Sequence, residues 1–261
     1  MIFIEPKYQK IFESQGLNSY ESIAAYFLSG SRQRAVTIKA GTLPGSGNSS
    51  LAVFFKEYHY PKPSWRFLGR ASKARREFQN YAAFAKIGIR AAERVAYGER
   101  RDLIRRLHSA FIITRAIPDA ITLTEFFKQH GSRDVPGSTA LRAQLLSQLA
   151  FMTKRIHAAN FFHNDLYWRN VLVTWVPPEA PGLWWIDCPR GGFKRRSFWP
   201  NRKQIKDLAS LDKIAAQLCT PKERIEFVKR YLDIQRLTES AKHLMRATLA
   251  YRRKRWPKDW T

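Results

Sequence analysis

The sequence predicts an α+β fold of two lobes, in which a small antiparallel-sheet lobe with one long helix precedes a larger helical lobe. Two observations lead to this class. Runs of β-branched and aromatic residues separated by Gly and Pro turns dominate residues 1–118, whereas long segments with helical apolar spacing dominate residues 119–261. The 261 residues, 44% of them hydrophobic, are enough for a buried core. We expect a single domain over 1–261 with its lobes joined near residue 118.

The first lobe begins with a short helix expected at roughly 6–16. The strands expected after it are rich in β formers and lie at 22–30, 34–41, 50–60, 94–99 and 109–117. The first two are expected to pair around Gly30. The long helix is expected within 69–88, where apolar residues recur at helical spacing and Gly88 ends the pattern.

The second lobe is expected to be mainly helical. Helices are predicted at 139–160, 202–218, 220–232 and roughly 238–253, with two short strands at 170–176 and 182–187. The third of these helices has a clear start, because Thr220 can cap it, Pro221 suits its first position and Glu223 can complete a capping box.

The charge balance limits the partners. Lys and Arg number 46 against 21 Asp and Glu, a formal net charge of +25, which favours polyanions: nucleic acid, an anionic membrane or a phosphorylated substrate. Cys188 and Cys219 form neither a disulfide framework nor a metal-ligand spacing. The first residues lack the apolar core of a signal peptide, and no stretch approaches the length that spans a bilayer, so a cytoplasmic protein is expected.

The stretch "FFHNDLYWRNVLV" at 161–173 places His163, Asp165 and Asn170 in the pattern H-x-D-L-x-x-x-N. Asp187 follows at the end of the apolar run "WWID". Phosphoryl transfer needs one carboxylate to accept the proton of the attacking hydroxyl, and it needs oxygen ligands for Mg²⁺ beside the phosphates. These residues are the groups that such a reaction requires, in that chain order.

Two charged residues in the first lobe complete the pattern. Lys56 lies late in the apolar strand "VFFKEY", and Glu77 lies in the first turns of the long helix. Their relation repeats the strand lysine and helix glutamate of the protein-kinase fold.

Together these residues resemble the protein-kinase fold and, more narrowly, the lipopolysaccharide core kinases, the Kdo/heptose kinase (WaaP and InaA-like) family of Gram-negative bacteria. The segments that carry the resemblance are "FFHNDLYWRNVLV", "WWIDCPRG" and "KDLASL", and it runs from about residue 20 to 235. It implies that Asp165 is the catalytic base and that Asn170 and Asp187 bind Mg²⁺. It also implies that Lys56, paired with Glu77, contacts the phosphates of ATP.

The resemblance implies supporting roles as well. Asp207 would match the helix aspartate that steadies the catalytic-loop backbone, and His163 would act as a scaffold for that loop. Gly30 would fall in the loop that covers the phosphates. Cys188 and Pro189 stand where protein kinases have Phe-Gly after the metal-binding aspartate.

A basic segment follows Asp187 with no acid before Asp207. Its cations are Arg190, Lys194, Arg195, Arg196, Arg202, Lys203 and Lys206. In a kinase fold this segment lies beside the acceptor, so we expect Arg190, Arg195 and Arg196 to help bind an anionic glycolipid; a solvated basic face is the alternative. The basic stretches 70–76 and 252–260 are expected to attract the protein to the anionic inner membrane.

The resulting hypothesis is an ATP-dependent kinase, with ATP and Mg²⁺ as cofactors, that phosphorylates a heptose or Kdo hydroxyl of the lipopolysaccharide inner core. A protein kinase is less well matched, because the interval from Asp187 to Asp207 is short for an activation segment and contains no A-P-E. A small-molecule phosphotransferase of the aminoglycoside type usually needs an acidic pocket for its cationic acceptor. A non-enzymatic polyanion binder leaves the catalytic pattern unexplained, and the sequence contains no recognised nucleic-acid module.

Overall fold

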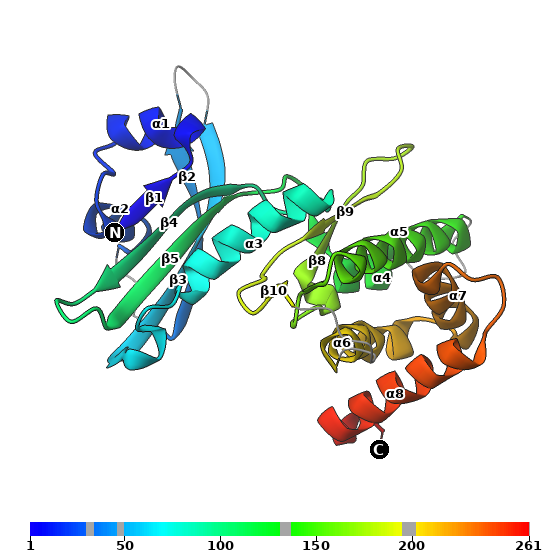
Figure 1. Ribbon diagram of the computed structural model, residues 1–261. Helices are drawn as coiled ribbons and strands as arrows, with labels where there is room; N and C mark the ends of the chain where they lie inside the picture. The colour runs from blue at the N-terminus through cyan, green and yellow to red at the C-terminus, as the bar shows by residue number, and fades with distance from the viewer. Residues whose placement is uncertain (30–33, 46–49, 131–136, 195–201, 261) are drawn as a thin grey trace. The chain divides into compact units, whose positions relative to one another are not determined.

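The computed structural model describes residues 1–29, 34–45, 50–130, 137–194 and 202–260 and confirms the predicted α+β class (Figure 1). The chain divides into two compact units. The first comprises residues 1–83 and 92–117, and the second comprises residues 84–91 and 118–261.

The first unit contains a five-stranded antiparallel sheet with the strand order β1-β4-β5-β3-β2. Its strands are β1 (Ile2–Ile4), β2 (Val36–Pro44), β3 (Ser50–Ser64), β4 (Arg94–Arg101) and β5 (Leu107–Arg115). The helical segments are η1 (Pro6–Tyr8), α1 (Gln9–Ser14), α2 (Tyr20–Leu28), η2 (Trp65–Phe67) and α3 (Lys73–Ile87), whose last turn belongs to the second unit.

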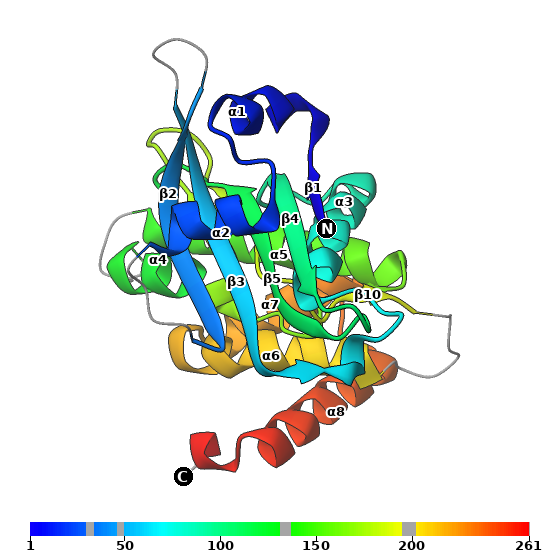
Figure 2. The same ribbon diagram turned by 90° about the vertical axis from the view of Figure 1, so that its left-hand side faces the viewer.

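Side-chain alternation along β3 separates the two faces of this sheet. Phe55 faces a buried core shared with α1 and α2, where its ring stacks on Phe27 at a centroid distance of 4.9 Å. The next residue, Lys56, points to the opposite face, where it meets Glu77 of α3. Helices α2 and α3 accordingly lie on opposite faces of the sheet (Figure 2).

The strand predicted at 22–30 is wrong, because residues 20–28 form helix α2. Ser19 caps this helix and forms a capping box with Ser22, and Tyr20, Ile23 and Phe27 bury one helical face. A short apolar run does not distinguish a strand from a helix by periodicity, so the cap and the sheet beneath decide the outcome. Gly30, which was expected in a turn between two strands, lies outside the described residues.

The second unit is largely helical and contains every helix predicted for it. Its helical segments are α4 (Leu123–His130), α5 (Ser138–Ala158), η3 (Trp168–Asn170), α6 (Arg202–Leu218), α7 (Pro221–Leu232), α8 (Glu239–Arg255) and η4 (Pro257–Trp260). Of the helices α4 to α8, the sequence predicted all except α4. In the described part of the chain, no helix combines the length and apolar character needed to cross a membrane.

Short strands frame the loops of the second unit. Strands β6 (Ile121–Thr122), β8 (Val171–Thr174) and β9 (Gly182–Trp185) form an antiparallel sheet in the order β6-β8-β9. Strand β7 (Phe161–Phe162) pairs with β10 (Gly192–Phe193). The loop that carries His163, Asp165 and Asn170 therefore begins and ends in hydrogen-bonded strands.

A bidentate ion pair joins α5 to the start of α7. Arg142 donates from Nε and Nη2 to Glu223 at 2.6 and 2.9 Å, and it also donates to the Leu218 carbonyl at 2.7 Å. Glu223 accepts from the backbone N–H of Thr220 at 2.7 Å, which completes the predicted capping box. Burial raises the pKa of Glu223, but the hydrogen bonds from Arg142 and Thr220 outweigh it and lower the pKa to about 2.

Replacing Glu223 by glutamine is expected to lower the free energy of unfolding at pH 7 by up to about 3 kcal/mol. The pKa of Glu223 falls from 4.5 to about 2, and each pKa unit corresponds to about 1.4 kcal/mol. The folded carboxyl has the lower pKa, so its contribution is complete above about pH 4.5 and is lost as pH falls toward 2. Urea unfolding of both proteins between pH 7 and 3 should show the difference shrinking. Glu226→Gln, on the more exposed face of α7, is the matched control, with an expected change below about 0.5 kcal/mol.

Candidate active site

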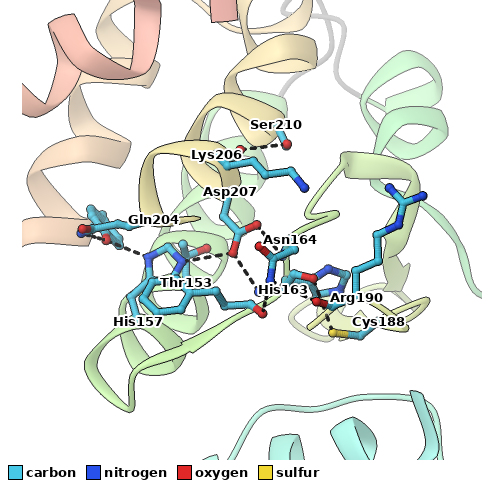
Figure 3. A network of polar contacts seen from close by, with 12 residues as sticks. Thr153, His157, His163, Asn164, Cys188, Arg190, Gln204, Lys206, Asp207 and Ser210 are labelled. Atoms are coloured by element: carbon cyan, nitrogen blue, oxygen red, sulfur yellow. Dashed lines mark hydrogen bonds and ion pairs between the residues drawn. The ribbon is translucent and has the colours of Figure 1, made fainter. Parts of the chain in front are cut away.

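A buried carboxylate holds the backbone of the loop that follows β7 (Figure 3). Asp207 of α6 is fully buried and accepts hydrogen bonds from the backbone N–H groups of His163 and Asn164, both at 2.8 Å. Asn164 adopts a left-handed conformation with φ of 64° and donates from its side chain to the carbonyls of Phe162 and Arg190, both at 3.1 Å. The shape of the loop is therefore set by the carboxylate of the distant Asp207 and by the side chain of Asn164 within the loop.

A second group of side chains orients Asp207 from the other side. His157 of α5 lies with Nε2 at 3.4 Å from the Asp207 carboxylate and with Nδ1 at 2.8 Å from the Tyr231 hydroxyl. Gln204 donates to the same hydroxyl at 2.7 Å. The sequence did not predict this network, because no local pattern links helices α5, α6 and α7.

His163 is fully buried in the second unit. Its ring stacks on Phe84 at a centroid distance of 6.0 Å and meets Trp185 edge-on at 5.8 Å. Burial lowers the pKa of His163 and outweighs the charges of the surrounding aspartates Asp207, Asp187 and Asp165. The imidazole is thus a neutral scaffold, with three carboxylates gathered around it.

The hairpin of β8 and β9 brings Asn170 close to Asp187. Val171 pairs with Trp185, and the Ile186 N–H donates to the Asn170 carbonyl at 3.0 Å, so Ile186 lies opposite Asn170. Asp187 is the next residue after Ile186. Asp187 has a φ of 56°, a left-handed conformation that is uncommon outside glycine. Non-glycine residues in such conformations concentrate at functional sites.

Asn170 also fixes the position of Asp165. Its side-chain N–H donates to the Asp165 carbonyl at 2.8 Å, which leaves the amide oxygen as the acceptor of that side chain. Magnesium favours one or two protein oxygens together with phosphate and water oxygens, so the Asn170 amide and the Asp187 carboxylate fit a magnesium–nucleotide site. No group of three His, Cys, Asp or Glu suited to a metal occurs in the described ranges.

In the first unit, Lys56 and Glu77 form the ion pair expected from their positions. Lys56 Nζ lies 3.1 Å from Glu77 Oε2, and the glutamate side chain is 3% exposed. Glu77 also accepts hydrogen bonds from the hydroxyls of Tyr58 at 2.8 Å and Tyr81 at 3.2 Å. Glu77 is therefore held rigidly on α3, and it orients the lysine on β3.

A basic pocket of about 450 Å³ opens beside Asp165 in the second unit. Its described lining residues are Asn164, Asp165, Tyr167, Arg190, Arg202, Lys203, Lys206, Tyr251, Arg255 and Trp256. Five of these ten are cations and one is a carboxylate. Burial and the nearby charges of Lys194 and Lys206 lower the pKa of Lys203, as expected where positive charges crowd together.

The outcome for the predicted acceptor residues is mixed. Arg190 lines the pocket, whereas Arg195 and Arg196 lie outside the described residues. Sequence reasoning missed Tyr167, Tyr251, Arg255 and Trp256 as lining residues. The last two belong to a stretch that was interpreted only as a membrane-attracting patch, since nothing in the sequence joins residue 256 to residue 165.

Comparisons with known proteins identify the family of the chain and a structure that shares its fold. The model of the lipopolysaccharide kinase (Kdo/WaaP) family matches residues 58–240. A solved structure described as WaaP in complex with acyl carrier protein superimposes with a TM-score of 0.70 at 23% identity, covering all of both chains, and shares the fold. A comparison with curated proteins gave no match. The family match spans well over half of the chain, so the protein belongs to the lipopolysaccharide kinase (Kdo/WaaP) family, a family of phosphotransferases.

Proposed function

We propose that this protein uses ATP and Mg²⁺ to phosphorylate a heptose or Kdo hydroxyl of the lipopolysaccharide inner core. The observation that carries the proposal is the basic pocket that opens on Asp165. Arginine and lysine side chains suit the phosphates and carboxylates of such an acceptor. Family membership supports the lipopolysaccharide acceptor class.

Asp165 is the proposed base. It is partly exposed at the pocket, and the Asn170 side chain fixes its backbone. Its carboxylate accepts the hydroxyl proton as the sugar oxygen bonds to the γ-phosphorus of ATP and the bond to the bridging oxygen of ADP breaks. Asn170 and Asp187 would hold Mg²⁺, which when bound neutralises phosphate charge, and Lys56 would contact the phosphates.

Incubating the protein with labelled ATP, Mg²⁺ and dephosphorylated core lipopolysaccharide tests the proposal. We expect acceptor-dependent incorporation of phosphate, with mass spectrometry locating it on a heptose or Kdo residue. Parallel assays contain a generic protein substrate, an aminoglycoside or nucleic acid at several salt concentrations. Transfer to one of the first two, or salt-dependent nucleic-acid binding without any transfer, contradicts the proposal and identifies the competing function.

Replacing Glu77 by glutamine tests the proposed role of Lys56. Glutamine can still accept from the tyrosines but lacks the charge that orients the lysine, so the KM for ATP should rise about 10-fold or more, the equivalent of a charge-assisted hydrogen bond. Glu13→Gln, an exposed glutamate on α1, should leave this KM unchanged. Initial rates at varied ATP, with thermal unfolding of each variant, measure the effect. An unchanged KM in a folded Glu77→Gln protein contradicts the role.

We also propose that the protein works at the cytoplasmic face of the inner membrane, where basic side chains would attract it. Arg253 and Lys254 at the end of α8 are exposed, whereas Arg252 is 5% exposed and paired with Asp212. Sedimentation with vesicles should show binding that grows with anionic lipid and weakens with salt. Equal binding to neutral vesicles contradicts this location.

The partner named for the solved WaaP structure is a further candidate for this chain. An apolar cavity of about 250 Å³ among α5, α6, α7 and α8 is lined by residues such as Leu149, Phe227 and Leu244, and it could accept part of an acyl chain. Acylated carrier protein is therefore expected to raise the melting temperature of this protein, whereas the unacylated carrier should not. An equal effect of both carriers contradicts occupation of the cavity by the acyl chain.

A further inference from the structure

The end of α8 supplies part of the wall of the basic pocket. Tyr251, Arg255 and Trp256 line the same pocket as Asp165. The family match ends at residue 240, before these three residues.

This wall is anchored to α6, the helix that supplies pocket cations. Arg252 of α8 is 5% exposed and donates to Asp212 of α6 at 2.9 Å. Asp212 is also bound by Arg224 of α7 at 2.8 and 3.0 Å, so one carboxylate ties three helices together. The backbone N–H of Trp256 donates to the carbonyl of Arg252 at 2.9 Å. Trp256 is thereby linked to the arginine that is bound to Asp212.

The wall combines aromatic faces with cations. The rings of Tyr167 and Trp256 lie 6.0 Å apart at an interplanar angle of 73°, which forms an apolar corner in an otherwise charged pocket. The electron-rich faces of such rings attract the polarised C–H groups of a sugar. Arg255 is exposed, and its planar guanidinium can hold a carboxylate or phosphate through two hydrogen bonds.

We propose that the end of α8 determines acceptor specificity: Tyr251 and Trp256 pack against the sugar ring, and Arg255 binds an anionic group on the same acceptor, so that a hydroxyl reaches Asp165. This inference rests on the proposed kinase function. The acceptor class is a sugar that carries a carboxylate or a phosphate. Tyr251, Arg255 and Trp256 are positioning residues for that sugar.

The test uses Arg255→Gln and Trp256→Ala in the full-length protein, with core lipopolysaccharide as the varied acceptor. Each variant should raise the acceptor KM about 10-fold or more, while the KM for ATP stays within twofold of the wild-type value. Arg255→Lys should restore part of the acceptor affinity. Arg246→Gln removes the same charge from an exposed position on α8, outside the pocket, and should behave as wild type.

Modified acceptors identify the anionic group. The wild type should lose affinity for an acceptor whose Kdo carboxyl is reduced if Arg255 binds the carboxylate, or for one lacking the lipid A phosphates if it binds a phosphate. Arg255→Gln should be insensitive to that same modification. Wild-type acceptor KM values in folded Arg255→Gln and Trp256→Ala proteins overturn the inference.

Direct binding separates this inference from the proposed reaction. Calorimetry with the soluble Kdo-containing core oligosaccharide, without ATP, should show binding to the wild type that Arg255→Gln loses. Binding of this kind without phosphate transfer by the wild type would reject the kinase function and keep the recognition site. Transfer with equal binding by wild type and Arg255→Gln would reject the recognition site alone.

Discussion

Replacing Asp165 by asparagine is expected to lower kcat for phosphoryl transfer by about 10³-fold or more while leaving the fold intact. The amide has the same shape but cannot accept the hydroxyl proton, and general-base catalysis typically contributes about 10²- to 10⁴-fold. The hydrogen bonds that fix residue 165 go to its backbone carbonyl, so the substitution does not remove them. Steady-state rates with saturating ATP and acceptor measure the effect, and a melting curve checks the fold.

Asp233→Asn is the matched control for this substitution. Asp233 caps α7 in a left-handed conformation that asparagine also tolerates, and its side chain is 81% exposed. We expect wild-type kcat in this variant. A kcat for Asp165→Asn within tenfold of the wild type would remove Asp165 as the base and with it the proposed mechanism.

Replacing Asp207 by alanine is expected to give the largest loss of stability, because two backbone N–H groups and His157 lose a buried acceptor at once. Each buried donor left without a partner costs about 1–3 kcal/mol. We therefore expect the free energy of unfolding to fall by about 3 kcal/mol or more, as urea unfolding would show. Activity should fall too, because the loop that carries Asp165 loses its defined shape.

Comparing Tyr231→Phe with Asp207→Ala separates the effect of losing the loop's shape from the effect of general destabilisation. Tyr231→Phe removes only the hydroxyl that contacts His157 and Gln204, so it should destabilise the protein by about 1 kcal/mol and largely preserve kcat. Asp207→Ala assayed below its melting temperature should still show a reduced kcat. Full kcat in the folded Asp207→Ala protein would mean that the loop does not depend on this carboxylate.

Local patterns predicted much of the fold because the physical signals were themselves local. Helix α6 spans the predicted residues 202–218, and α7 begins after the predicted Thr220 cap. The error at 20–28 arose because an apolar run suits either a strand or a helix that covers a sheet. Helix α4 was missed, since its eight residues give too short a periodic pattern.

The sequence by itself predicted the family of this protein, which the family match confirms. It also predicted the groups of the candidate site, because Asp165 and Asn170 belong to one short motif and Asp187 ends the next apolar run. Only the tertiary structure showed how Asp207 and His157 hold that loop, and that Arg255 and Trp256 share a pocket with Asp165. Contacts between distant helices depend on packing and on buried hydrogen bonds. The spacing of residues along the chain does not predict which distant helices pack together or which buried hydrogen bonds join them.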